Sequence, residues 1–241
     1  MTKSVFFATA ALLASAAAIA DPGYYLVTVY ENEGQANIDY RYWTVKPAHS
    51  PETVWPEIGL GYGVTKRWYT ELYASAIGPS LTNTRLSSLN WQNDYLLTQG
   101  QYDFDLALHT NLIHIYGGGG QAFEYGPVLQ TEVGRLQLNG NLVFERTFDR
   151  PVFKPTQLKY QWQVKYRWKP AFQFGLQGFG ELGEWNHWAP RSRQSHRAGP
   201  MTSGTLPLGA TQEFEYQAAF LTGSIYGTRG HMLSMRLQYE F

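Results

Sequence analysis

The last thirteen residues of the chain, RGHMLSMRLQYEF (229–241), alternate between apolar and polar side chains over their final nine positions. The apolar positions are Leu233, Met235, Leu237, Tyr239 and Phe241, and the residues between them are Ser234, Arg236, Gln238 and Glu240. Successive side chains of a β-strand point to opposite faces, so a period of two predicts a strand with one apolar face and one polar face. Chain termini are usually frayed and polar, so an amphipathic strand at this position is unusual.

The same alternation recurs along the chain in segments of about ten residues, the length of a membrane-spanning β-strand. It is clearest at 158–169, LKYQWQVKYRWK, where one face carries two Trp and two Tyr and the other carries only Lys, Arg and Gln. A soluble sandwich strand also alternates, but it rarely combines these two faces. We predict twelve strands, at 37–44, 54–64, 67–77, 88–98, 102–112, 122–133, 136–145, 158–169, 171–183, 196–206, 213–220 and 229–241.

The connectors between these segments mostly alternate between longer and shorter ones. Bacterial barrels have long outer loops and short periplasmic turns, and both termini are usually periplasmic. Twelve strands starting at residue 37 place the short connectors VTKR, TQGQ, EVGR and WKPA on the periplasmic side. Residues 24–33, YYLVTVYENE, also resemble a strand, but counting them reverses this arrangement. We interpret them as a hairpin arm or a periplasmic or luminal segment; alternatively they form strand one, and a weak segment such as 196–206 is not a full strand.

The N-terminal end has the pattern of a secretory signal peptide. In residues 1–20, MTKSVFFATAALLASAAAIA, Lys3 precedes an apolar stretch that ends on small residues at Ala18 and Ala20. Cleavage after Ala20 leaves 241 − 20 = 221 residues. The alternative is an uncleaved membrane anchor. The expected organisation is a signal peptide at 1–20, an N-terminal arm or hairpin at 21–36, and an outer-membrane barrel at 37–241.

Composition narrows the class of protein. Without Lys3 there are 18 basic and 19 acidic side chains, so no basic excess suggests nucleic-acid binding. The absence of cysteine excludes disulfides, thiol catalysis and an acylated N-terminal cysteine. Charged residues are 16% and aromatic residues 16% of the chain, and no run of 18 apolar residues follows the signal. An exported, aromatic-rich chain without a spanning helix indicates an all-β fold, a closed antiparallel transmembrane barrel in the bacterial outer membrane.

The C-terminal strand also carries a resemblance. RLQYEF, with Leu237, Tyr239 and Phe241 at alternate positions, resembles the final strand of bacterial outer-membrane β-barrels. The resemblance implies that this strand is the assembly signal read by the barrel-assembly machinery. More loosely, the layout of the whole mature chain is similar to the outer-membrane transporter group associated with phenol-degradation pathways, without a sharp motif.

The polar faces of the predicted strands define a candidate lumen. A twelve-stranded barrel lies between eight-stranded barrels, which side chains fill, and the open channels of larger barrels. Charged side chains on these faces either select small solutes or form an ion-paired network that holds the barrel in shape. We expect the basic positions of 158–169 to pair with Glu145 and Glu181 on neighbouring strands. The residues predicted to line the lumen are Arg41, Asp94, Asp103, Asp105, His109, Glu145, Lys159, Lys165, Arg167, Glu181, Glu213, Glu215 and Arg236.

Other chemistry has little support in the sequence. No GxSxG motif is present, and His109 beside Asn111 is the nearest approach to a hydrolytic site. GGGG at 117–120 lacks the spacing of a phosphate loop and is expected to be a flexible outer loop. No cofactor or metal is implied. Basic residues Arg191, Arg193 and Arg197 are candidate contacts for lipopolysaccharide phosphates, or are merely solvated.

Three functions follow from this interpretation. The first is a non-enzymatic outer-membrane barrel that acts as a narrow channel or transporter for small solutes. The second is a structural or surface-interaction barrel with a plugged lumen. The third is a barrel enzyme that acts on lipid. The expected partners are outer-membrane lipid, lipopolysaccharide, the barrel-assembly machinery and a solute that the sequence does not identify.

Overall fold

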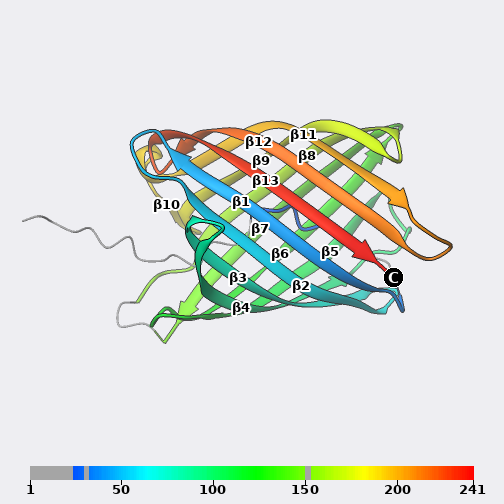
Figure 1. Ribbon diagram of the computed structural model, residues 1–241, viewed down its shortest axis with the longest axis horizontal. Coiled ribbons are helices and arrows are strands. Elements are labelled where there is room, and N and C mark those ends of the chain that lie inside the picture. The colour runs from blue at the N-terminus through cyan, green and yellow to red at the C-terminus, as the bar shows by residue number, and fades with distance from the viewer. Residues whose placement is uncertain (1–23, 30–32, 150–152) are drawn as a thin grey trace, which may run out of the picture.

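The computed structural model describes residues 24–29, 33–149 and 153–241, and most of them lie in antiparallel β-strands (Figure 1). The predicted signal peptide at 1–20, residues 21–23 of the predicted arm, and residues 30–32 and 150–152 lie outside the described residues. Within the described ranges no helix is long and apolar enough to cross a membrane.

Twelve strands form the wall of a barrel, at the positions that the alternating pattern predicts. They are β1 (Ala36–Pro47), β2 (Thr53–Thr65), β3 (Trp68–Ser80), β4 (Asn83–Leu96), β5 (Phe104–Ile115), β6 (Gly120–Val133), β7 (Leu136–Phe148), β8 (Gln157–Lys169), β9 (Phe172–Glu184), β11 (Ser195–Pro207), β12 (Glu213–Ile225) and β13 (Thr228–Glu240). A two-residue strand, β10 (His187–Trp188), extends the hairpin after β9, and a short 3-10 helix, η1 (Arg191–Arg193), follows it. The prediction of an all-β, twelve-stranded closed barrel is confirmed.

The barrel closes between its first and last strands. Each wall strand pairs with the next along the chain, and β13 pairs antiparallel with β1 in a register that places Tyr40 opposite Leu237. At the end of this seam the backbones of Ala36 and Phe241 exchange hydrogen bonds of 3.0 and 2.9 Å. In lipid an unpaired strand edge leaves backbone groups unsatisfied. The ordered C-terminal strand is therefore a requirement of closure.

The connectors differ from the predicted alternation of lengths. β3 and β4 pair as far as Ser80 and Asn83, and β12 and β13 pair as far as Ile225 and Thr228. The segments 78–85 and 224–230, predicted to be longer loops, are thus tight hairpins, because their residues continue the ladder. At the end of the barrel where the chain terminates, which was predicted to carry the short turns, the connectors 97–103 and 208–212 are longer than these hairpins. Loop length therefore distinguishes the two ends less clearly than expected.

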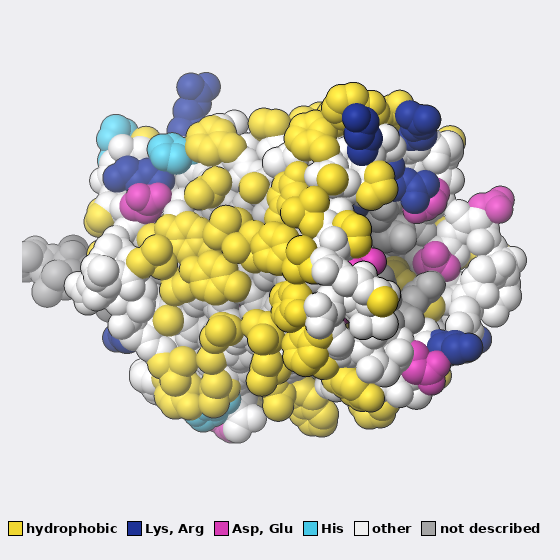
Figure 2. Space-filling view, turned by 45° about the vertical axis from the view of Figure 1, so that its right-hand side comes forward, with side chains coloured by type: hydrophobic (Ala, Val, Ile, Leu, Met, Phe, Trp, Pro, Cys, Tyr) yellow, Lys and Arg dark blue, Asp and Glu magenta, His cyan; other side chains and the backbone are white. Residues whose placement is uncertain are grey.

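The outer surface of the barrel is apolar over its middle (Figure 2). Leu60, Leu72 and Leu176 are 65%, 64% and 53% exposed. Exposure of so many apolar side chains is unfavourable in water and favourable in the hydrocarbon of a bilayer. On β9 the outward glycines Gly178 and Gly180 lie beneath the rings of Trp162 and Tyr160 from β8, so a Cβ at either position would meet an aromatic ring. The apolar face of each strand is the face that the alternation predicts to contact lipid.

The interior is less uniformly polar than the sequence suggested. In the half of the barrel away from the C-terminus, an apolar cluster packs inside the wall, with Leu221 and Met232 both 0% exposed. Leu221 and Met232 lie opposite each other on the inward faces of β12 and β13, farther from the C-terminus than the polar inward residues Gln217 and Ser234. The members of the cluster are Tyr24, Trp43, Val45, Phe179, Met201, Ala219, Leu221, Ile225 and Met232.

Candidate functional site

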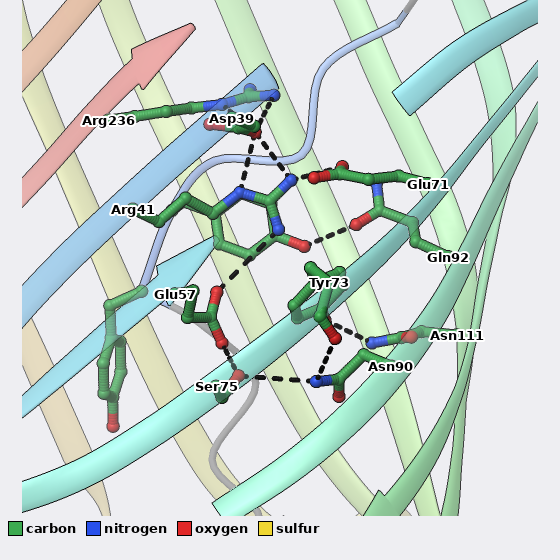
Figure 3. Close-up of polar contacts among 12 residues, drawn as sticks. Asp39, Arg41, Glu57, Glu71, Tyr73, Ser75, Asn90, Gln92, Asn111 and Arg236 are labelled. Atoms are coloured by element: carbon green, nitrogen blue, oxygen red, sulfur yellow. Dashed lines mark hydrogen bonds and ion pairs between the residues drawn. The ribbon is translucent and has the colours of Figure 1, made fainter. Parts of the chain in front are cut away.

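A cluster of charged side chains fills the middle of the lumen around Arg41 (Figure 3). The Arg41 guanidinium lies 2.8 Å from Asp39 and 3.8 Å from Glu57, and it also contacts Glu71. Arg236, from the adjacent β13, contacts Asp39 at 2.7 Å. Inward positions of β1, β2, β3 and β13 therefore place three carboxylates around two guanidinium groups, and the cluster carries one excess acidic group.

This cluster is almost inaccessible to solvent. Arg41 and Glu71 are each 1% exposed and Asp39 is 0% exposed. Isolated buried charges are very costly, so such groups persist only when they are paired and hydrogen-bonded. Ser75 donates a hydrogen bond to Glu57, and Asn90 lies 3.4 Å from the Ser75 hydroxyl, so a polar network surrounds the ion pairs (Figure 3).

Two further pairs extend the polar network along the wall. Lys159 of β8 contacts Glu145 of β7 and lies 3.5 Å from Glu124 of β6. His109 of β5 lies 2.6 Å from Asp94 of β4, through its Nδ1 atom. The lumen wall is thus lined by groups that bind one another across adjacent strands.

The described part of the N-terminal arm, residues 24–29, runs through the lumen without forming a strand. The Tyr25 ring lies against Arg41, with the guanidinium carbon 3.8 Å from the ring centre, and the Tyr24 ring lies against Arg197 at 4.1 Å. The Tyr25 hydroxyl donates a 2.6 Å hydrogen bond to Gln92. Both tyrosines are 4% exposed. Cation–π contacts of this kind contribute about 0.5–2 kcal/mol each, so the arm is held firmly.

Side chains of the wall also bind the backbone of the arm. Gln161 accepts a hydrogen bond from the Val27 N–H at 3.1 Å and donates one to the Tyr25 carbonyl at 3.0 Å. Asn141 donates to the Val27 carbonyl at 2.7 Å, and Ser234 donates to the Tyr24 carbonyl. The barrel therefore satisfies the extended backbone of this segment as a neighbouring strand would, but with side chains.

Two cavities lie on either side of this closed middle. One, which we call the C-terminal vestibule, has a volume of about 500 Å³. It opens at the end of the barrel where the chain terminates, and its lining includes Asp105, Lys165, Glu215 and Glu240. The other, which we call the opposite vestibule, has a volume of about 280 Å³, and its lining includes Glu145, Lys159, Glu181 and Tyr226. In the described residues, no group of three or more His, Asp or Glu is arranged to hold a metal ion.

Most residues predicted to line the lumen lie on inward faces. Arg41 and Arg236 meet at Asp39, Lys159 meets Glu145, Asp94 meets His109, and Lys165, Asp105 and Glu215 share the C-terminal vestibule.

Three predicted positions differ. Asp103 precedes β5 and is exposed, Glu213 is exposed at the first residue of β12, and Arg167 pairs with Glu132 at 2.6 Å at the rim, where its side chain is 36% exposed. β8 and β12 extend beyond the enclosed part of the lumen, so Arg167 and Glu213 lie at its rim, and Asp103 lies outside β5.

Two predicted contacts are wrong. Glu181 lies opposite Lys159 in the register, yet its 2.8 Å ion pair is with Arg197 of β11, and it also accepts from Tyr24 and Tyr226. Arg197 was also a candidate contact for lipopolysaccharide, but it is 2% exposed and faces the lumen because β11 begins at Ser195. The exposed basic residues of that loop are Arg191 and Arg193.

Sequence reasoning missed the role of Tyr24 and Tyr25 as partners of buried arginines. The pair YY at the start of the strand-like run was visible, but alternation cannot show that a segment leaves the wall and enters the lumen. It also missed the apolar cluster, for which the signal was the loss of polar residues on both faces of β12 from Ala218 to Leu221.

Comparisons with known proteins bear on the fold alone. No protein-family model and no curated protein matches the sequence. An outer-membrane channel from Pseudomonas putida F1 is similar in structure, with a TM-score of 0.63 and 12% identity over 92% of this chain and 99% of that chain. The NanC porin has a TM-score of 0.57 and 11% identity over 85% and 98% of the two chains, and the KdgM porin has 0.55 and 10% over 85% and 99%.

These three neighbours share the closed antiparallel wall described above, at identities too low to transfer a solute or a residue's role. The resemblance to the phenol-degradation-associated group stays a prediction. The closed wall, the apolar outer surface and these similarities establish that this chain has the fold of the bacterial outer-membrane β-barrels.

Proposed function

We propose that this chain is an outer-membrane channel for small solutes. The observation that carries the proposal is that a charged and amide-rich wall runs between the two vestibules of the closed barrel. Between the vestibules the lumen is closed by residues 24–29, and this segment is not part of the wall. Polar walls of this kind lower the barrier for a hydrated solute, and rings of charged side chains select among solutes. Movement of the arm would leave the barrel itself intact, because the wall strands pair without it.

The proposed setting of this channel comes from its two surfaces and its sequence. The apolar outer face fits a bilayer, and the predicted signal peptide fits export to the outer membrane. The C-terminal strand ending at Phe241 fits recognition by the barrel-assembly machinery. Arg191 and Arg193, the exposed first and last residues of η1, fit contact with lipopolysaccharide phosphates if that end of the barrel faces outward.

The experiment is single-channel recording of the purified, folded chain in a planar bilayer. We expect small conductance steps from the unaltered chain and larger or more frequent steps from the Tyr24→Ala, Tyr25→Ala double variant, in which both ring contacts with arginine are lost. The matched control is Tyr62→Ala, which removes an exposed tyrosine from the outer face of β2. A folded barrel that never conducts, with or without the arm substitutions, contradicts the proposal.

A plugged structural barrel is the second candidate, and the buried Arg41 cluster favours it. Gln92 is 0% exposed and Arg41 and Glu71 are 1% exposed, so the middle of the lumen is packed like a protein core. Such a barrel would be heat-modifiable on gels and impermeable under all of the conditions above. If it acts through surface binding, deletion of the 185–196 loop should remove the binding phenotype.

The third candidate, a lipid-modifying enzyme, receives no support from the geometry. His109 is 2% exposed and binds Asp94 rather than a serine, and Asn111 donates to the Tyr73 hydroxyl at 2.7 Å. A nucleophilic serine needs a base within hydrogen-bond reach. We propose that the barrel is not an enzyme, and unchanged lipid hydrolysis by the His109→Ala variant in purified protein would exclude that site from any activity found.

A further inference from the structure

A smaller cavity adjoins the C-terminal vestibule, and amide and hydroxyl groups make up most of its polar wall. Its volume is about 100 Å³, and the lining residues that matter here are Gln163, Gln173, Ser203 and Gln217. We call it the amide cavity. It shares part of its wall with the vestibule, because Lys165 and Glu215 line both spaces. A solute in the vestibule therefore has this cavity beside it.

The charges around the amide cavity are balanced. Lys165 and Glu215 both line it, so one group of each sign is present. Arg236 lines it as well, but its guanidinium contacts Asp39 at 2.7 Å. Glu215 also accepts a 3.2 Å hydrogen bond from the Thr205 hydroxyl. Because electrostatic complementarity discriminates between solutes of different charge, a balanced wall favours neither anions nor cations.

Two amides of this wall are held in a fixed orientation by Gln177. The Gln177 Oε1 atom accepts a hydrogen bond from Gln163 at 3.1 Å and one from Gln217 at 3.0 Å. Gln177 is itself 0% exposed. An amide has two N–H donors and a carbonyl oxygen, so Gln163 and Gln217 each keep one donor and one acceptor for a further partner. The wall can therefore both donate to a solute and accept from it.

Two buried polar atoms of the same wall have no partner. Ser203 of β11 and Gln173 of β9 lie opposite each other in the register, and both line the amide cavity. Ser203 is 7% exposed, and within the described part of the chain neither its hydroxyl nor Gln173 Oε1 makes a hydrogen bond. Buried polar atoms normally have a partner, so such an exception calls for a ligand or a water molecule. A solute hydroxyl can donate to the Gln173 oxygen and accept from the Ser203 hydroxyl.

We propose that the amide cavity binds small neutral polyols. An apolar solute would leave Ser203 and Gln173 without partners, and an ionic solute would meet a like charge in Lys165 or in Glu215. A cavity of about 150 Å³ holds benzene, so one of about 100 Å³ accepts a molecule of about the size of glycerol. The inference rests on the proposed function and names the solute class of the same lumen.

Saturation-transfer NMR on the purified full chain tests the proposal, in glycerol-free buffer and a detergent without a sugar headgroup. Four three-carbon probes separate hydroxyl content from charge: glycerol, 1,3-propanediol, malonate and 1,3-diaminopropane. We expect glycerol to bind at least about threefold more tightly than each of the others, the effect of one hydrogen bond. Ser203→Ala and Gln173→Met should each weaken glycerol binding by about two- to tenfold. Ser203→Ala should not lower the unfolding midpoint, because its hydroxyl makes no hydrogen bond within the described residues.

The matched control is Ser50→Ala, which removes an exposed hydroxyl that does not line the amide cavity and should leave glycerol binding unchanged. Equal binding of glycerol and 1,3-propanediol, or tighter binding of either ionic probe, would overturn the proposal. So would absence of glycerol binding, or unchanged binding in the Ser203→Ala, Gln173→Met double variant; in either case water is the occupant. A chain that binds glycerol at this cavity but carries no current refutes the channel and leaves the site. A conducting chain that does not bind glycerol refutes the site and leaves the channel.

Discussion

Replacement of Arg41 should destabilise the barrel more than any other single luminal charge change, because its guanidinium is shared by three buried carboxylates. In the Arg41→Met variant, Asp39, Glu57 and Glu71 remain with Arg236 as the nearby cation, so the cluster changes from one excess negative charge to two. Removal of one partner from a buried ion pair costs about 3–5 kcal/mol. Met fills most of the arginine stem's volume, so the loss is chiefly electrostatic.

The matched variant is Arg236→Met, which removes the same charge from a more exposed position. The Arg236 side chain is 11% exposed against 1% for Arg41, and Glu57 and Glu71 keep Arg41 as their partner. Its cost should be smaller, about 1.5–3 kcal/mol, the range for hydrogen bonds to a charged group, because Asp39 keeps Arg41 as a partner. In the Arg41→Met background, Glu57→Gln should recover part of the loss, since it removes one uncompensated charge.

The assay is heat or urea unfolding of the detergent-folded protein, followed by the shift between folded and unfolded mobility on a gel. Equal stability of Arg41→Met and Arg236→Met would refute the view that the cluster is held by Arg41.

Three other predictions concern the wall, the arm and the last strand. Gly126→Ala should lower the unfolding midpoint by the equivalent of about 1–3 kcal/mol, because its Cβ would lie 1.8 Å from the Leu142 carbonyl oxygen; Gly140→Ala, whose Cβ meets nothing within 4 Å, is the control in the same gel assay. Gln161→Leu should raise the conductance in planar bilayers by loosening the arm, since it removes the two hydrogen bonds that Gln161 makes to the arm backbone; an unchanged conductance would count against the arm as the closure. Phe241→Ala should reduce the amount of barrel assembled in cells while leaving the midpoint of the folded fraction nearly unchanged, because the Phe241 ring is 49% exposed and contributes little packing; equal losses of both would indicate a structural role instead.

Much of the wall was predictable from alternation because a membrane imposes it. A strand with lipid on one side and a polar lumen on the other has a fixed side-chain period, so segments such as 158–169 identified both the strand and its inward face before any partner was known. The same rule correctly gave the inward positions of Arg41, Asp94, His109 and Lys159. It failed at Asp103 and Glu213, where the period continues past the point at which the enclosed lumen ends.

The sequence by itself determined the number of strands, the face that each turns to the lumen, and the need for a C-terminal strand that closes the wall, because these follow from local periodicity and from backbone hydrogen bonding. Only the tertiary structure decided that Glu181 binds Arg197 rather than Lys159, that Tyr24 and Tyr25 lie against buried arginines, and that acidic residues from β5, β6, β12 and β13 share one vestibule. Those choices depend on distances across the barrel interior, between residues that are from 16 to 173 positions apart in the chain, and a one-dimensional pattern does not contain them.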